Sequence, residues 1–221
     1  VNGKTITFSG TYTSAAAANF ILDAQNSSSV VFNGVPTFVA SAISTDETTN
    51  FQFGANATID ATITTLNNLT LTGTATVAQG GALTLYGNLT VPSGATFDKA
   101  TFDLTVYGDV SNAGTLTLDG AAGTITLHGQ MIGSGTYTTG ATTILSIQGT
   151  SSQFVLPAGV TTLGTLTLNR PTGMKLMAGL TVGDGAAANN DVDIVLGDLD
   201  LNGFNLTLAD DDAQISETAG N

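Results

Sequence analysis

The sequence predicts an all-β chain folded as a right-handed parallel β-solenoid. Short bursts of residues alternate between apolar and polar with a period of two, as in LTLYGNLTV at 83–91, so that the leucines and Val91 share one face. Variants of this phrase begin again at positions 69, 104, 116, 125, 145 and 199. Gly and Asn stand between the bursts, as expected at corners where φ is positive. One strand type repeated this often favours stacked coils.

Residues 1–29 are predicted to form an N-terminal segment with a strand and a loop. TITF at 5–8 alternates well and lies outside the larger repeat, so this segment is a candidate cap or pairing strand. Ala15 to Leu22 has some helical propensity, but it is too short for more than one helical turn. Val at position 1 indicates a processed or excised chain.

Residues 30–221 are predicted to form the solenoid, as two related units at about 30–143 and 144–221. The phrases at 64–66 and 69–71 (TTL and LTL) return 97 positions later at 161–163 and 166–168. The first unit carries an insertion around Ser44–Asn56. Intervals of 9 to 21 residues between the first six short phrases exclude a strict short repeat and fit coils with loops of variable length.

The alternation also predicts which side chains face inward and which face solvent. His128, the single histidine, takes the fourth place of ITLHG and is expected on the outer face. Tyr86 and Tyr107 hold the same place in their phrases, so neighbouring coils could align them. The predicted inward ladders contain Leu69, Leu71, Leu83, Leu85, Leu104, Val106, Leu116, Leu118, Ile125, Leu127, Leu166 and Leu168.

An antiparallel β-sandwich or jelly roll is the alternative fold, with Gly87-Asn88 as a two-residue hairpin turn. Its strands would be only three or four residues long, which is marginal for an antiparallel sheet. A sandwich also seldom repeats one phrase seven times. The solenoid is therefore preferred.

The order of FNG, TTLNNLTLTG, LTLYGNLTV and LDLNGFNLTL resembles the repeat regions of very large secreted surface proteins, especially those of the Bacteroidota. The resemblance covers most of residues 30–221. It implies a string of β-solenoid units that acts as a stalk or adhesin, and an extracellular location at the cell surface.

Composition excludes several partners and chemistries. With 17 acidic and 4 basic residues, the net charge of −13 repels phosphates and anionic lipids, so neither nucleic acid nor membrane is expected as a partner. The chain has no cysteine, which removes disulfides, thiol catalysis and Cys-based metal sites. No apolar run approaches the roughly 18 residues of a membrane span, so membrane insertion is not expected.

No catalytic residue is predicted. His128 is interpreted as an exposed strand residue, because one histidine without cysteine cannot build a usual zinc site. Arg170 and Lys175 in LNRPTGMKL are the best enzymatic candidates, since a basic residue near carboxylates can abstract a proton in β-helix polysaccharide lyases. Pro171 and Gly173 mark this segment as a loop, so both charges are expected to be solvated.

Four aspartates are candidate calcium ligands. Asp191 and Asp193 are two positions apart, as are Asp198 and Asp200, so each pair should project from one side of a strand. Asp184 and Asp210–Asp212 lie nearby in the sequence. A hard cation would relieve the repulsion between these carboxylates, and an acidic face without a ligand is the alternative. Asn-x-Ser/Thr occurs at Asn26, Asn56, Asn68, Asn88 and Asn205.

The function predicted from these observations is structural, without catalysis: a repeat segment of an extracellular stalk, sheath or filament. Its expected partners are neighbouring repeats or further copies of the chain, joined end to end. An adhesin that binds surface glycans through an exposed face is the alternative, and a β-helix polysaccharide lyase is a weaker one because only four basic residues exist.

Overall fold

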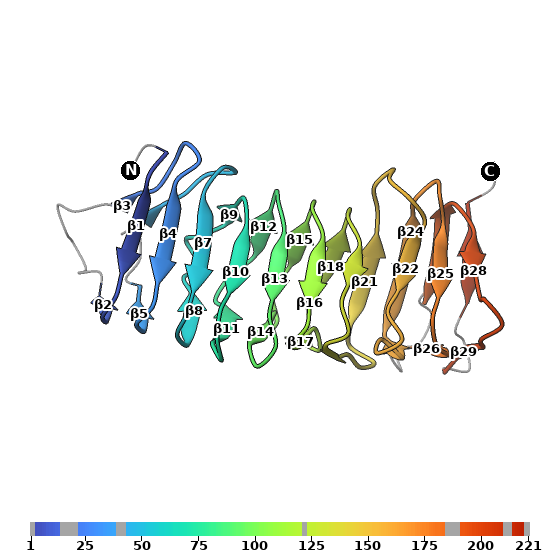
Figure 1. Ribbon diagram of the computed structural model, residues 1–221. Coiled ribbons are helices and arrows are strands. Elements are labelled where there is room, and N and C mark those ends of the chain that lie inside the picture. Colours follow the sequence, from blue (N-terminus) through green and yellow to red (C-terminus); the bar gives the residue numbers. More distant parts are fainter. Residues whose placement is uncertain are drawn as a thin grey trace.

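The computed structural model describes residues 3–13, 22–38, 43–120, 123–183, 191–209 and 214–218. In these ranges every regular element is a β-strand, and each strand pairs only in parallel with strands three places away along the chain. Three consecutive strands therefore make one turn, and the turns stack into a rod with β1 (Thr5–Phe8) near one end and β28 (Leu199–Asp200) near the other (Figure 1). The parallel pairing confirms the β-solenoid and excludes the antiparallel sandwich. None of the described residues forms a helix that could cross a membrane.

The turns have three sides, which we call the first, second and third walls. The first wall is a seven-stranded sheet of β1, β4 (Ser29–Phe32), β7 (Asn50–Phe53), β10 (Leu69–Leu71), β13 (Leu89–Val91), β16 (Val110–Asn112) and β19 (Met131–Ile132). A three-stranded sheet of β22 (Phe154–Leu156), β25 (Met174–Leu176) and β28 follows it on the same side.

The second wall consists of three sheets. They are the pair β2 (Tyr12–Thr13) and β5 (Pro36–Thr37), the five strands β8 (Ala57–Ile59), β11 (Thr76–Gln79), β14 (Thr96–Asp98), β17 (Thr115–Thr117) and β20 (Thr136–Thr138), and the three strands β23 (Thr162–Leu163), β26 (Leu180–Val182) and β29 (Leu206–Leu208). A break in the ladder therefore separates each sheet of this wall from the next.

The third wall contains the longest ladder. The pair β3 (Leu22–Asp23) and β6 (Ile43–Ser44) precedes an eight-stranded sheet of β9 (Thr65–Leu66), β12 (Leu83–Leu85), β15 (Leu104–Val106), β18 (Thr124–Leu127), β21 (Ile144–Ile147), β24 (Thr165–Asn169), β27 (Val192–Leu196) and β30 (Ile215–Glu217). This sheet runs unbroken from β9 to β30, through the middle and the C-terminal part of the rod.

The core consists of apolar ladders that run along the rod. All twelve side chains predicted to face inward are buried, each at 2% exposure or less, which confirms the alternation. Strand register stacks them turn on turn, so that Leu85 lies between Leu66 and Val106. Each fully buried leucine or valine contributes roughly 1.5–3 kcal/mol of transfer free energy, and this repeated term holds the turns together.

The corner between the third and first walls explains the phrase LTLYGNLTV. The Asn68 side chain accepts a hydrogen bond from the backbone N–H of Asn88 at 2.7 Å, and Asn88 does the same for Asp109 at 2.8 Å. At Gly108 a Cβ atom would meet the carbonyl oxygen of Gly87 at 2.5 Å, so this approach of two turns requires glycine. The Gly-Asn step therefore makes a corner between walls, and the hairpin alternative for Gly87-Asn88 is wrong.

The N-terminal segment contributes strands to the same stack. β1 pairs with β4 along its length, from Thr5 opposite Ser29 to Phe8 opposite Phe32. Phe8 also packs against Tyr12 and Phe32, at ring-centroid distances of 4.5 and 5.3 Å. Leu22 belongs to β3, and residues 15–21 of the predicted helical stretch lie outside the described ranges.

The phrases that recur 97 positions apart in the sequence do not lie on the same wall. Residues 65–66 lie in β9 of the third wall, whereas their counterparts at 162–163 form β23 of the second wall. Residues 69–71 and 166–168 likewise lie in the first and third walls. The sequence repeat therefore preserves a type of strand, and not the position of that strand in the turn.

Two junctions interrupt the rod. Between β6 and β7 only the first wall is continuous, because the ladders of the second and third walls restart at β8 and β9. Between β21 and β22 only the third wall is continuous. At this second junction the Gln130 side chain bridges the gap in the first wall: its Nε2 donates to the carbonyl of Gln153 at 3.1 Å, and its Oε1 accepts from Val155 N–H at 3.2 Å.

Candidate functional site

Two rows of side chains lie on the outer face of the eight-stranded sheet. In the first row, register aligns the hydroxyl side chains Thr65, Thr84, Thr105, Thr126, Ser146 and Thr167. The second row follows the buried ladder by one residue and contains Tyr86, Tyr107 and His128, which we call the aromatic row. From β9 to β24 these rows form an uncharged strip, in which Ser146 is buried, on a chain with a net charge of −13. In β27 the register continues the first row with Asp193.

The aromatic row is a stack of nearly parallel rings. Tyr86 and Tyr107 have ring centroids 5.2 Å apart and planes inclined by 11°, and each is 46% exposed. His128 continues the stack beyond Tyr107 at 4.3 Å and 16°. This confirms that neighbouring coils align the two tyrosines. Because the rings cover one another's faces, the row presents mainly ring edges to solvent, whereas a sugar stacks on an exposed ring face.

His128 lies at the end of this stack in an environment that disfavours its charged form. Burial lowers the pKa of His128, and the nearby guanidinium of Arg170 lowers it further. Its backbone carbonyl accepts a hydrogen bond from Arg170 Nη1 at 2.9 Å. The imidazole is therefore a half-buried member of the sheet surface, in an environment that suits its neutral form.

We expect this histidine to make stability depend on pH. Its folded-state pKa lies below the unfolded value of about 6.5, so its neutral form contributes fully at higher pH and stability falls as pH drops through about 6.5. A His128→Gln variant, which repeats the Gln148 of the next turn, should lose less stability over this range. Melting temperatures of both proteins between about pH 7.5 and 5.5 test this. Equal losses in the two proteins would contradict it.

Arg170 is not the solvated loop residue that the sequence predicts. Its side chain is 0% exposed and its guanidinium donates to the backbone carbonyls of His128, Gln148 and Ser152 at 2.9, 2.6 and 2.9 Å. It also contacts the Ser151 hydroxyl and lies 5.8 Å from the centre of the Phe154 ring. The turn at 170–173 places Arg170 under the loop of the preceding turn, at the second junction, and there it has a structural role.

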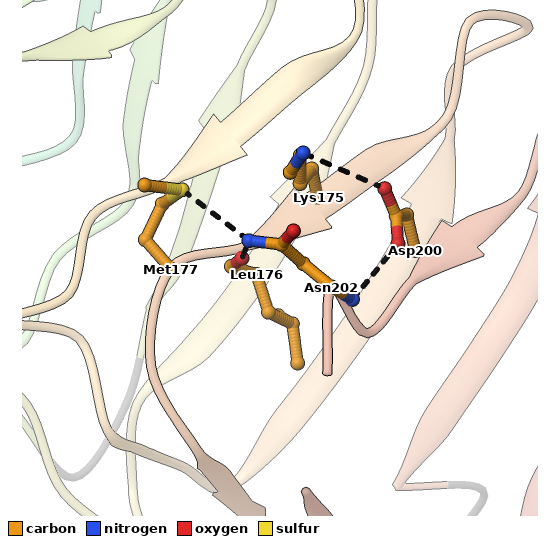
Figure 2. A network of polar contacts seen from close by, with 5 residues as sticks. All are labelled: Lys175, Leu176, Met177, Asp200 and Asn202. Atoms are coloured by element: carbon orange, nitrogen blue, oxygen red, sulfur yellow. Dashed lines mark hydrogen bonds and ion pairs between the residues drawn. The ribbon is translucent and has the colours of Figure 1, made fainter. Parts of the chain in front are cut away.

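Lys175, the other basic candidate, lies on the outside of the first wall. Its ammonium is 3.9 Å from Asp200 Oδ2 on the next turn, and the two side chains are 35% and 46% exposed (Figure 2). Asn202 closes this corner with a positive φ of 51° and donates from Nδ2 to the Leu176 carbonyl at 3.1 Å. The structure therefore separates Lys175 from Arg170, because one is exposed and the other is internal.

A second buried cation was not singled out from the sequence. Lys99 is 0% exposed and donates to the carbonyls of Phe102 and Gly123, both at 3.1 Å. Burial lowers its pKa, against the opposing effect of Asp103, Asp98 and Asp119. Lys99 stands in the segment DKATFD, and it is internal because the turn that follows folds over its ammonium.

The structure places the four calcium candidates on two different walls. Asp191 is buried beside β27 of the third wall, and Asp193 accepts a hydrogen bond from the Ser216 hydroxyl at 2.6 Å. Asp198 immediately precedes β28 of the first wall and Asp200 lies in that strand, where Asp200 Oδ1 accepts from the Asn202 backbone N–H at 2.8 Å (Figure 2). Within the described ranges no three His, Cys, Asp or Glu side chains form a group that could hold a metal ion. Asp184 and Asp210–Asp212 lie outside those ranges, so calcium binding stays a prediction.

The second wall carries an open groove of about 720 Å³ near the first junction. Its lining comes from three successive turns: residues 35–38, residues 56–61 in and around β8, and Thr76, Ala78 and Gly80 in and after β11. Asp60 is the charged residue of its lining, and neither Arg170 nor Lys175 belongs to it. Among the described residues that line the groove, none is basic, so they do not supply the paired basic and acidic groups that proton abstraction from a polysaccharide requires.

No family model matches the chain, and no curated protein or solved structure matches it significantly.

Proposed function

We propose that the protein is a structural segment of an extracellular stalk, sheath or filament, and that it joins end to end with further solenoid turns. The observation that carries this proposal is the stacking itself, in which every described strand pairs in parallel with an equivalent strand of a neighbouring turn. Each turn satisfies the backbone edge of the turn before it and presents a new edge, so the architecture extends in one direction.

The last described turn supports the proposal. Its inward-facing Leu206 and Leu208 are partly exposed, whereas their register partners Leu180 and Val182 in the turn before are at 1% and 0%. Phe204 and Ile215 in the same turn are 40% and 52% exposed. Another turn stacked here, in the same polypeptide or in a second copy, would bury this apolar end and pair its three strands.

The test is the length of the particle in solution. We expect small-angle scattering to show an elongated rod whose length increases with protein concentration, because the apolar end associates. A Phe204→Glu/Ile215→Glu double variant should remain a single rod, since two charges at the end oppose association. Ile132→Glu is the matched control, because Ile132 is 48% exposed on the side of the rod, and it should associate like the parent.

Two outcomes would count against the proposal. If the parent protein has the same length at all concentrations, copies do not associate end to end. The solenoid could then be extended only by further turns of the same polypeptide. A compact particle would contradict both versions.

A glycan-binding adhesin is the second candidate. The uncharged hydroxyl row of the third wall favours it, because hydroxyl groups can exchange hydrogen bonds with a neutral sugar chain. The aromatic row gives it little support, since its rings show their edges. Arg170 gives no support to a polysaccharide lyase, because its side chain is buried and hydrogen-bonded to backbone carbonyls. Binding on a glycan array, lost in a Thr84→Ala/Thr105→Ala/Thr126→Ala variant, would favour the adhesin.

A further inference from the structure

The two exposed tyrosines of the aromatic row are held next to each other by the backbone. Leu85 and Val106, which precede them, are register partners in β12 and β15, and the Tyr107 N–H donates to the Leu85 carbonyl at 2.8 Å. The ring centroids lie 5.2 Å apart and the ring planes are inclined by 11°, so the two phenols are side by side on the surface. Both rings are 46% exposed and can tilt outward about χ1 and χ2.

We infer that Tyr86 and Tyr107 form an oxidative cross-linking site, at which a one-electron oxidant such as a haem peroxidase with hydrogen peroxide makes a dityrosine. Each phenol loses one electron and one proton to give a phenoxyl radical. The two radicals join through the ring carbons beside the hydroxyl groups, and each ring then loses its C–H proton to the regenerated phenol oxygen or to water. In total two hydrogens leave the protein, and one hydrogen peroxide becomes two water molecules.

Selectivity for this pair follows from exposure and distance. The other two tyrosines, Tyr12 and Tyr137, are 9% and 7% exposed, and burial raises the pKa of both phenols. They lie on the second wall in β2 and β20, separated by several turns. Prior alignment replaces a bimolecular encounter of radicals by an intramolecular one, which favours the product between Tyr86 and Tyr107.

The product would be a covalent tie between successive turns in a chain that has no cysteine for disulfides. It would close a loop from residue 86 to residue 107 and restrict the unfolded chain as a disulfide does. The melting temperature of the cross-linked monomer should therefore exceed that of the untreated protein. This inference depends on the aromatic row alone and does not require end-to-end assembly.

The experiment uses the whole protein with a haem peroxidase and hydrogen peroxide, followed by isolation of the monomer on a denaturing gel. Trypsin cleavage after Lys99 separates Tyr86 from Tyr107 in the denatured chain. We expect the two peptides to remain joined, with a mass equal to their sum less two hydrogens, and with dityrosine fluorescence. Tyr86→Phe and Tyr107→Phe should each lose the joined species, because phenylalanine keeps the stacked ring but has no phenol. Tyr12→Phe and Tyr137→Phe should retain it.

Three results would overturn the inference. One is an unlinked monomer, although free tyrosine in the same reaction is oxidised. Another is a joined species in Tyr86→Phe at the parental yield, which would place the link elsewhere. The third is an adduct of Tyr107 with His128 in place of dityrosine. Circular dichroism spectra that coincide for parent and variants exclude a loss of fold as the cause.

Discussion

Replacing Arg170 with Met should lower the free energy of unfolding by about 3 to 5 kcal/mol, because the backbone carbonyls that accept from its guanidinium lose a charged donor. Methionine fills much of the space but donates no hydrogen bonds. The carbonyls of His128, Gln148 and Ser152 would lose the guanidinium as a donor, and the Ser152 carbonyl would keep its 3.3 Å hydrogen bond from Gln130 Nε2. Each such acceptor costs about 1–3 kcal/mol, and imperfect burial or water reduces the sum.

Lys175→Met is the matched control for this change. It removes a positive charge five residues away, but Lys175 is 35% exposed and its ion pair with Asp200 is 3.9 Å long. An exposed pair of this kind contributes about 1 kcal/mol or less. Urea denaturation of both variants measures the difference. Similar midpoints for the two would show that the Arg170 contacts do not stabilise the junction.

Leu85→Asp should destabilise the solenoid by about 4 kcal/mol or more, which is beyond the range of ordinary substitutions. Leu85 is 0% exposed and lies between Leu66 and Val106 in the ladder of the third wall. The change removes a buried apolar side chain and places a carboxylate where its neighbours are apolar. The variant should melt at a much lower temperature and lose part of its strand signal in circular dichroism.

Thr84→Asp tests whether the position in the alternation, and not the residue type, decides this effect. Thr84 is the preceding residue of the same strand, faces outward and has Thr65 and Thr105 as its neighbours in the hydroxyl row. We expect a loss of about 1 kcal/mol or less, because the new charge is solvated. If both variants melted alike, the inward and outward assignment of this strand would be wrong.

The sequence predicted the features of the fold that depend on a single strand. A period of two is fixed by strand geometry, so the twelve inward side chains followed from parity alone. The alignment of Tyr86 with Tyr107 also followed, because equal places in equal phrases remain equal when turns stack in register. These inferences needed no knowledge of loop lengths.

The features that were missed depend on how one turn meets the next. The phrase NRPTG has the composition of a solvated turn, yet Arg170 is internal because the loop of the preceding turn, around 148–152, folds over it. The aspartate pairs are only a few residues apart, but the chain turns a corner at Gly197 between them, with φ at +92°, and so places them on different walls. Neither the closure of a loop nor the position of a corner is visible in the local alternation.

The two junctions have a mechanical consequence for a rod of this kind. At each junction only one wall has a ladder that continues from the turn before the junction to the turn after it. This continuous wall is the first wall at the first junction and the third wall at the second junction. Such a junction resists stretching along the continuous wall and opens more easily on the opposite side, as a hinge does. Because the continuous wall differs between the two junctions, the N-terminal and the C-terminal turns should bend away from the middle of the rod in different planes. A sideways load should therefore deform the rod at the junctions before it deforms the middle turns.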